Sequence, residues 1–124
     1  MWCERSGVGI RYELSGRRGR SVVLVHELGG SLESWDQVVP MLEPTLHVLR
    51  YDQRGAGLSE KVRAPFTAAD QARDLEALLE TADLTPPVDI AGVAAGAVVA
   101  VALAARRPDL ARSLVLTSPS IGID

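Results

Sequence analysis

The residues with the clearest chemical signature lie between Gly92 and Gly96, where an apolar strand runs into an apolar helix. In the pattern Gly-x-Ser-x-Gly, such a turn sets a serine hydroxyl above a sheet as a nucleophile. Glycines are needed at both ends because the strand and helix backbones approach closely there. The central position here is Ala94, which has no nucleophilic atom. The sequence therefore predicts a nucleophile elbow that lacks its nucleophile.

Two more loops carry polar residues directly after apolar runs. The run 21–26 ends in His26 and is followed by the flexible loop 27–30, Glu-Leu-Gly-Gly. The run 46–52 is followed by a loop, and the segment 52–59 reads Asp-Gln-Arg-Gly-Ala-Gly-Leu-Ser. A continuous apolar run is expected of a parallel strand that is covered on both faces.

The remaining strands follow from the spacing of apolar residues. Apolar and polar residues alternate from Val8 to Leu14, which predicts a half-buried antiparallel strand. Together with residues 2–5, this strand should form an N-terminal hairpin. A final buried strand is expected at 113–117.

Helices are predicted between the parallel strands. Ser34 and the glutamine three residues later resemble a capping box, so a helix should begin there and be kinked or shortened by Pro40. Thr67 opens a second helix, with Asp70 near its N-terminus. The helix after the elbow should end at about Arg107, because a proline follows. Strands joined by crossover helices predict an α/β protein with a three-layer αβα sandwich and a mostly parallel sheet.

Composition limits the function classes. The 124 residues form at most one domain, and an apolar fraction of 47% with 23% charged residues indicates a globular protein. The net charge of −3 has mixed signs and gives no nucleic-acid patch. No apolar run is long enough for a membrane span, no signal peptide is visible, and the chain has one cysteine, so we expect a cytoplasmic protein. No metal cluster, phosphate loop or dinucleotide fingerprint is present, and no cofactor is expected.

The three loops, in this order, resemble the α/β-hydrolase superfamily. The likeness is to its 3-oxoadipate enol-lactonase and meta-cleavage-product hydrolase branch. The Asp-x-Arg-Gly-x-Gly-x-Ser segment at 52–59 is the most specific match. The resemblance covers nearly the whole chain but only the N-terminal half of the family's fold. Residues 1–124 would therefore be a partial α/β-hydrolase domain without the lid, the last strands and the late catalytic histidine.

The resemblance also implies site residues. It places the oxyanion hole at the backbone amides of Leu28 and Ala95, beside Ala94. It assigns His26 to the oxyanion loop rather than to a catalytic base. We expect His26, Gly29 and Trp35 to be substrate-binding residues, with the alternative that Trp35, as the aromatic residue of an amphipathic helix, packs in the core.

Three other residues have competing interpretations. Glu27 stands beside the expected oxyanion site, where a desolvated carboxylate could act as a general acid or base. The alternative is that Glu27 points outward or pairs with an arginine such as Arg54. Asp52 and Arg54 could be read as an acid–base pair, but arginine does not deprotonate. The resemblance instead implies that both residues brace turns below the pocket.

We expect a hydrolase-family protein that acts on a small carbonyl compound, with hydrolysis of an ester, a lactone or a C–C bond. Loss of a triad nucleophile costs on the order of 10⁶-fold in rate, so acyl-enzyme chemistry at Ala94 is not expected. Four explanations of Ala94 remain. It could be an engineered Ser→Ala change in a true hydrolase, or the chain could be a hydrolase in which a carboxylate activates water directly. The other two are a non-serine decarboxylase, lyase or isomerase that uses the oxyanion hole, and a non-catalytic ligand-binding protein. A complementary C-terminal half or a second chain is the expected partner, and a homo-oligomer is the other arrangement considered.

Overall fold

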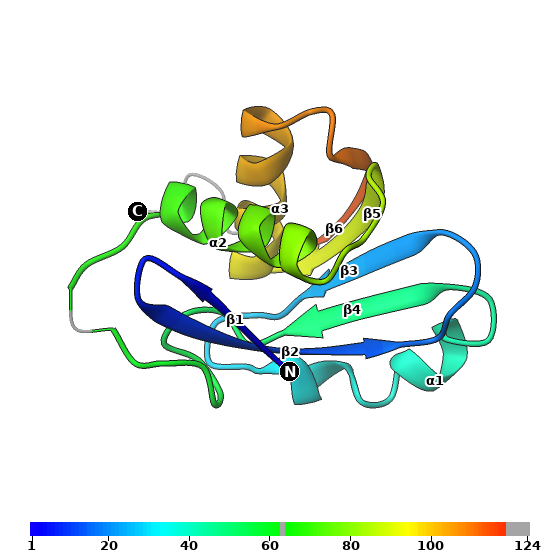
Figure 1. The fold of residues 1–124 in the computed structure, drawn as a ribbon, viewed down its shortest axis with the longest axis horizontal. Helices are drawn as coiled ribbons and strands as arrows, with labels where there is room; N and C mark the ends of the chain where they lie inside the picture. Colours follow the sequence, from blue (N-terminus) through cyan, green and yellow to red (C-terminus); the bar gives the residue numbers. More distant parts are fainter. Residues whose placement is uncertain (63, 119–124) are drawn as a thin grey trace.

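Six strands form one mixed sheet in a computed structural model that describes residues 1–62 and 64–118. The strand order is β1-β2-β4-β3-β5-β6 (Figure 1). The pairs β1–β2 and β2–β4 are antiparallel, whereas β4, β3, β5 and β6 run parallel. The strands are β1 (Trp2–Arg5), β2 (Val8–Ser15), β3 (Ser21–Val25), β4 (His47–Tyr51), β5 (Val88–Val93) and β6 (Ala111–Thr117). This arrangement confirms the predicted hairpin and parallel sheet.

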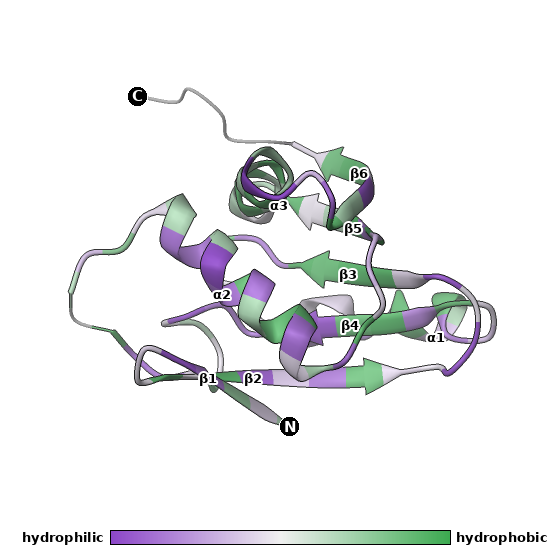
Figure 2. Ribbon diagram, turned by 45° about the horizontal axis from the view of Figure 1, so that its top comes forward, coloured by the Kyte–Doolittle hydropathy of each residue, from purple (hydrophilic) through white to green (hydrophobic). Residues whose placement is uncertain are grey.

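Helices cover both faces of the sheet. The long helices α2 (Ala68–Thr81) and α3 (Ala95–Arg106) lie on one face, over the main core (Figure 1). The short helices η1 (Leu32–Trp35) and α1 (Val39–Leu42) lie on the other. Alternate residues of β3 supply the two cores, with Val23 in the first and Val22 in the second. Figure 2 shows β3 as apolar and several turns of α2 as hydrophilic.

Helix α2 begins where the sequence predicts. The Thr67 hydroxyl accepts a hydrogen bond from the Asp70 amide, and the Asp70 side chain accepts one from the Thr67 amide. Each bond satisfies a backbone donor that the helix leaves unpaired. The buried stripe of α2 contains one residue that its apolar spacing did not indicate, Asp74, whose side chain is 2% exposed.

The prediction for the segment after β3 is wrong in its details. The N-cap is Ser31, whose hydroxyl accepts a hydrogen bond from the Glu33 amide, and Ser34 is the third helical residue instead. The chain then forms one 3-10 turn and a separate α1 in place of a continuous helix. Pro40 lies in the first turn of α1, where its missing N–H leaves no helical bond unmade.

Strand β6 is not buried, contrary to the expectation from its apolar sequence. Val115 is 60% exposed and Leu116 is 37% exposed. The cause is position, because β6 is the last strand of the described sheet and pairs only with β5. None of the helices in the described ranges is long and apolar enough to cross a bilayer.

Candidate active site at the carboxyl ends of the parallel strands

The elbow between β5 and α3 has the strained backbone of a nucleophile position. Ala94 has φ 52° and ψ −115°, and its amide donates to the carbonyl oxygen of Thr117 at 2.8 Å. A Cβ on Gly92 would lie 2.5 Å from the carbonyl oxygen of Gly96. A Cβ on Gly96 would overlap the carbonyl oxygen of Val25. Both glycines are therefore required by close backbone approach, as the sequence predicts.

The loop after β3 contains a tight turn. The Gly30 amide donates to the carbonyl oxygen of Glu27 at 3.0 Å, and Gly29 has φ +80°. Leu28 is not among the residues with positive φ, so the turn is of type II, with glycine at the position that favours it. Leu28 occupies the second position, where its side chain is 87% exposed.

Two backbone amides in this region are candidates for the predicted oxyanion hole. Neither the Leu28 nor the Ala95 amide donates a hydrogen bond to another group in the described part of the chain. Ala95 is the first residue of α3, where amides lack helical acceptors. Close packing of Gly96 against Val25 and His26 brings this helix end to the loop after β3. Leu28 and Ala95 both line one cavity.

His26 is buried and fixes the loop after β3. Its Nε2 accepts a hydrogen bond from the Gln53 amide at 3.0 Å, and its Nδ1 lies 2.7 Å from the carbonyl oxygen of Glu27. This pattern requires the neutral ring with the proton on Nδ1. Gln53 Nε2 donates to the His26 carbonyl oxygen, and Gln71 Nε2 donates to Gln53 Oε1. Helix α2 is thus linked through Gln53 to His26, two residues before Leu28.

Asp52 holds the loop after β4. Its carboxylate is fully buried and accepts hydrogen bonds from the amides of Leu32 at 2.7 Å and Leu58 at 2.8 Å. Arg11 Nε forms an ion pair with the same carboxylate at 2.8 Å. Gly57 packs directly against these oxygens, where a Cβ would not fit. These contacts support the prediction that the loop is architectural.

Arg54 does not pair with Glu27 or Asp52. It binds Asp74 on α2 through Nε at 2.7 Å and Nη2 at 2.9 Å. Hydrogen bonding to Asp74, against the effect of burial, raises the pKa of the Arg54 guanidinium. Burial in the same neighbourhood raises the pKa of the Tyr51 phenol.

The cavity has a volume of about 640 Å³ and lies among the three loops. Of the predicted site residues, His26, Glu27, Leu28, Gly29 and Ala95 line it. Ala94 precedes Ala95 at its wall. Trp35 lies elsewhere, because it packs on the second core against Val22 and its neighbours. The lining residues that the sequence did not single out are Gln53, Lys61, Val62, Phe66 and Gln71.

Glu27 lines the cavity, as one prediction has it, but makes a contact that the sequence did not indicate. The Ser34 hydroxyl donates to Glu27 Oε1 at 2.6 Å, and the carboxylate folds back over Gly30. The expected pairing of Glu27 with Arg54 is wrong, because Arg54 binds Asp74 instead. The acid–base role of Glu27 stays a prediction that rests on its place in the cavity wall.

The two histidines of the sequence do not face Ala94 as a base would. Both ring nitrogens of His26 are engaged, and His47 opens β4 at the end of the strand away from the cavity. Asp124, an acidic residue that follows β6 in the sequence, lies outside the described residues.

Known proteins share this arrangement. The profile of a family described as "alpha/beta hydrolase fold" matches residues 20–124. A Variovorax paradoxus protein whose name assigns it as a carbamate hydrolase is 38% identical over 112 residues, 88% of this chain and 42% of that protein. A pimeloyl-(acyl-carrier protein) methyl ester esterase of Neisseria meningitidis is 37% identical over 99 residues, 80% of this chain and 36% of that protein.

A solved structure agrees with these sequences. The enol-lactonase from Burkholderia xenovorans LB400 superimposes with a TM-score of 0.86 at 31% identity, over 92% of this chain and 45% of that chain. The chain therefore spans less than half the length of each of these three proteins.

Proposed function

Because the chain belongs to the α/β-hydrolase family, we propose that it acts on a small carbonyl compound such as an ester or a lactone. The carbonyl oxygen would accept hydrogen bonds from the amides of Leu28 and Ala95, with the reacting carbon above Ala94. Relatives named for ester, carbamate and enol-lactone substrates support this substrate class.

The observation that carries the proposal is the backbone of Ala94. A non-glycine residue at φ 52° and ψ −115° costs on the order of 1–3 kcal/mol and persists only where its surroundings impose it. A turn with no demand on its shape would relax or use glycine. The elbow therefore keeps the strained backbone of a nucleophile turn although residue 94 is alanine.

The same residue favours a second candidate function. With a methyl group at position 94, the chain has no nucleophile there for an acyl-enzyme. The oxyanion donors suit either non-serine chemistry on an enolisable carbonyl, as in a decarboxylase, lyase or isomerase, or binding without turnover. Backbone donors are independent of the side chain at position 94, so all these functions share one binding mode.

A complementary polypeptide is part of this proposal. The outer edge of β6 pairs with no strand in the described ranges, and the relatives are more than twice as long as the matched region. Native mass spectrometry of the purified material tests this directly. A stable, cooperatively folded monomer of 124 residues would contradict the need for a second half, and a homodimer would support self-association instead.

The binding mode can be tested by NMR titration of the labelled chain with methyl butyrate. We expect the amide proton resonances of Leu28 and Ala95 to shift, and methyl butyl ether, which lacks the carbonyl, to leave them unmoved. Leu28→Pro suits the second position of a type II turn and removes one donor. It should weaken ester binding, whereas Leu28→Ala, which keeps the amide, should not. Equal effects of ester and ether would contradict the proposal.

Turnover of p-nitrophenyl butyrate by the chain and by Ala94→Ser then separates the candidate functions. Turnover with Ala94 in place favours a non-serine enzyme, and carbonyl binding without turnover in either form favours a binding protein. Fast turnover only in Ala94→Ser means that an acid and a base are supplied to the elbow. In that active form, Leu28→Pro should lower kcat about 10²–10³-fold, the usual effect of losing one oxyanion donor.

A further inference from the structure

The peptide that carries the Leu28 amide is held by hydrogen bonds to its carbonyl oxygen. That oxygen belongs to Glu27, and it accepts from His26 Nδ1 at 2.7 Å and from the Gly30 amide at 3.0 Å. In a planar trans peptide the C=O and the N–H point in opposite directions. The two donors on the Glu27 carbonyl therefore direct the Leu28 N–H away from the His26 ring. The direction of this N–H thus depends on how the ring is fixed.

Gln53 fixes the His26 ring and also the peptide before it. The backbone N–H of Gln53 donates to His26 Nε2 at 3.0 Å, and its side-chain Nε2 donates to the His26 carbonyl oxygen at 2.8 Å. Both of the successive peptides that lead into Leu28 therefore depend on residue 53. Gln53 is 6% exposed, and a polar group left unpaired at such a site is costly.

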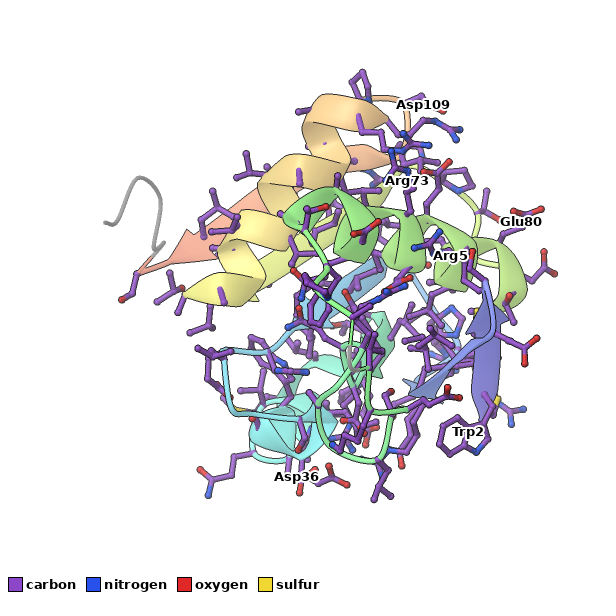
Figure 3. The ribbon with its side chains drawn as sticks, turned by 90° about the vertical axis from the view of Figure 1, so that its left-hand side faces the viewer. Trp2, Arg5, Asp36, Arg73, Glu80 and Asp109 are labelled. Carbon is purple, nitrogen blue, oxygen red and sulfur yellow. The ribbon has the colours of Figure 1, made fainter. Side chains whose placement is uncertain are left out.

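Gln71 fixes the orientation of the Gln53 side chain. The His26 carbonyl oxygen only accepts, so it selects the amide nitrogen of Gln53, and Gln71 Nε2 donates to the remaining Oε1 at 2.9 Å. Gln71 lies in the first turn of α2, half-buried in the cavity wall. Figure 3 shows α2, with Arg73 labelled, on the opposite side of the sheet from Asp36, which follows η1. The loop after β3 is therefore supported from the α2 side.

The second candidate donor, the Ala95 amide, is held in another way. It opens α3, and the residue before it is fixed by the hydrogen bond from the Ala94 N–H to the Thr117 carbonyl oxygen at 2.8 Å. Within the described ranges, neither Gln53 nor Gln71 makes a hydrogen bond to this elbow. Loss of the glutamine contacts should therefore affect the two amides differently.

We propose that Gln53 is a positioning residue for the oxyanion hole, acting through His26 on the Leu28 amide, with Gln71 as its support on α2. This inference rests on the proposed function, because it gives the Leu28 amide the role of a carbonyl-binding donor. A misplacement of about 1 Å at a reacting centre can cost about 10²-fold in rate, so the direction of a single donor matters.

NMR relaxation of the free chain tests the positioning step without a ligand. The isotope-labelled chain is purified together with any polypeptide that accompanies it. We expect the Leu28 N–H to have an order parameter of about 0.85, the value of rigid backbone, and to fall below about 0.6 in Gln53→Met. Gln71→Met should cause a smaller fall, because it removes only the outer bond. The Ala95 value should stay at that of the parent in both variants.

Gln37→Met is the matched control. It makes the same change at an exposed position whose side chain has no hydrogen bond in the described part of the chain, and it should leave both amides unchanged. Unchanged Leu28 order in Gln53→Met and Gln71→Met overturns the inference. Equal losses at Leu28 and Ala95 also overturn it, because the variant then loosens the whole site. If circular dichroism shows that Gln53→Met does not fold, the result for Gln71→Met decides.

Titration with methyl butyrate connects the positioning to carbonyl binding. In Gln53→Met, we expect the ester to shift the Ala95 resonance but no longer that of Leu28, and to bind several-fold more weakly, as for one lost hydrogen bond. Equal binding by parent and variant, with Leu28 shifting in both, overturns the inference and leaves carbonyl binding intact. An ester that shifts neither amide of the parent rejects the proposed function, and the role of Leu28 with it.

Discussion

The loop after β4 and the elbow after β5 lie at the same end of the sheet but are held by opposite means. The first depends on a side chain, because the buried Asp52 carboxylate gathers two amides and Arg11. The second depends on backbone contact, because Gly92 and Gly96 allow β5, α3 and the end of β3 to touch.

This difference explains how the elbow keeps its shape without a serine. Residue 94 is fixed by the hydrogen bond from its backbone N–H to the Thr117 carbonyl oxygen and by the close packing of Gly92 and Gly96. Its own side chain takes no part, so the position can lose its hydroxyl while the amide of Ala95 stays in place. At Asp52 a comparable truncation would remove the group that organises the loop.

The largest expected effect comes from breaking the side-chain-held loop. Asp52→Ala leaves two amides without their acceptor and removes one of the two carboxylates that pair with Arg11, which should lower the free energy of unfolding by about 3–5 kcal/mol. Urea unfolding measures it. Asp36→Ala is the control: Asp36 is 58% exposed in its pair with Arg50, and its loss should cost less than about 1 kcal/mol. Similar losses for both would contradict the comparison.

The backbone-held elbow should break on the addition of one methyl group. Gly96→Ala places a Cβ against the carbonyl oxygens of Val25 and His26, neither of which belongs to a flexible side chain. We expect a loss of about 1–3 kcal/mol in the free energy of unfolding, the usual range for overpacking. Gly7→Ala is a useful contrast, since its Cβ meets no atom and only its φ of +80° is unfavourable. A neutral Gly96→Ala would show that the elbow can open.

Relief of strain at the elbow should have a smaller effect of opposite sign. Ala94→Gly removes the cost of a positive φ, partly offset by greater freedom of the unfolded chain. We expect the free energy of unfolding, measured by thermal denaturation, to rise by about 1 kcal/mol. Ala77→Gly, in the regular helix α2, should instead lower the free energy of unfolding by about 1 kcal/mol. If both glycines destabilise equally, Ala94 is not strained.

The smallest effect concerns the outer side of Arg11. Hydrogen bonds from Arg11 and then Ser31 lower the pKa of Glu33 to about 2 from 4.5. A lowered folded-state pKa stabilises the fold above the unfolded value, and this contribution is lost as pH falls from about 4.5 to 2. Glu33→Gln should therefore destabilise at pH 7 and match the parent near pH 2. The difference should stay below about 1 kcal/mol, because the side chain is 52% exposed. A pH-independent difference would assign the effect to packing.

The sequence predicts the elements of this fold well where local patterns decide them. Alternation from Val8 to Leu14 and the Thr67 cap give a strand and a helix start that the structure confirms. The segment after β3 is harder, because Ser31 and Ser34 both have capping chemistry and only their distance from β3 decides between them. The exposure of β6 depends on which neighbours a strand has, and residue types alone do not encode that.

The candidate site divides in the same way. The elbow and the turn at Gly29 follow from glycine spacing, since backbone geometry restricts the residues that fit. The links from Gln71 through Gln53 to His26, and from Arg54 to Asp74, join residues about 20 positions apart or more. Those pairs depend on how α2 crosses the sheet. A charged residue within the apolar stripe of α2 is the one local signal that could have indicated Asp74.

The strand order also has a consequence for synthesis of the chain. β3 is central in the sheet, yet both of its partners, β4 and β5, come later in the sequence. A nascent chain emerging from the ribosome therefore carries the apolar segment Val22–Val25 with one side unpaired until Val93 has been made. Long-range strand pairing of this kind is slow, and until it forms, exposed apolar segments can aggregate with other chains. We therefore expect chaperones that bind emerging polypeptides to contact β3 first.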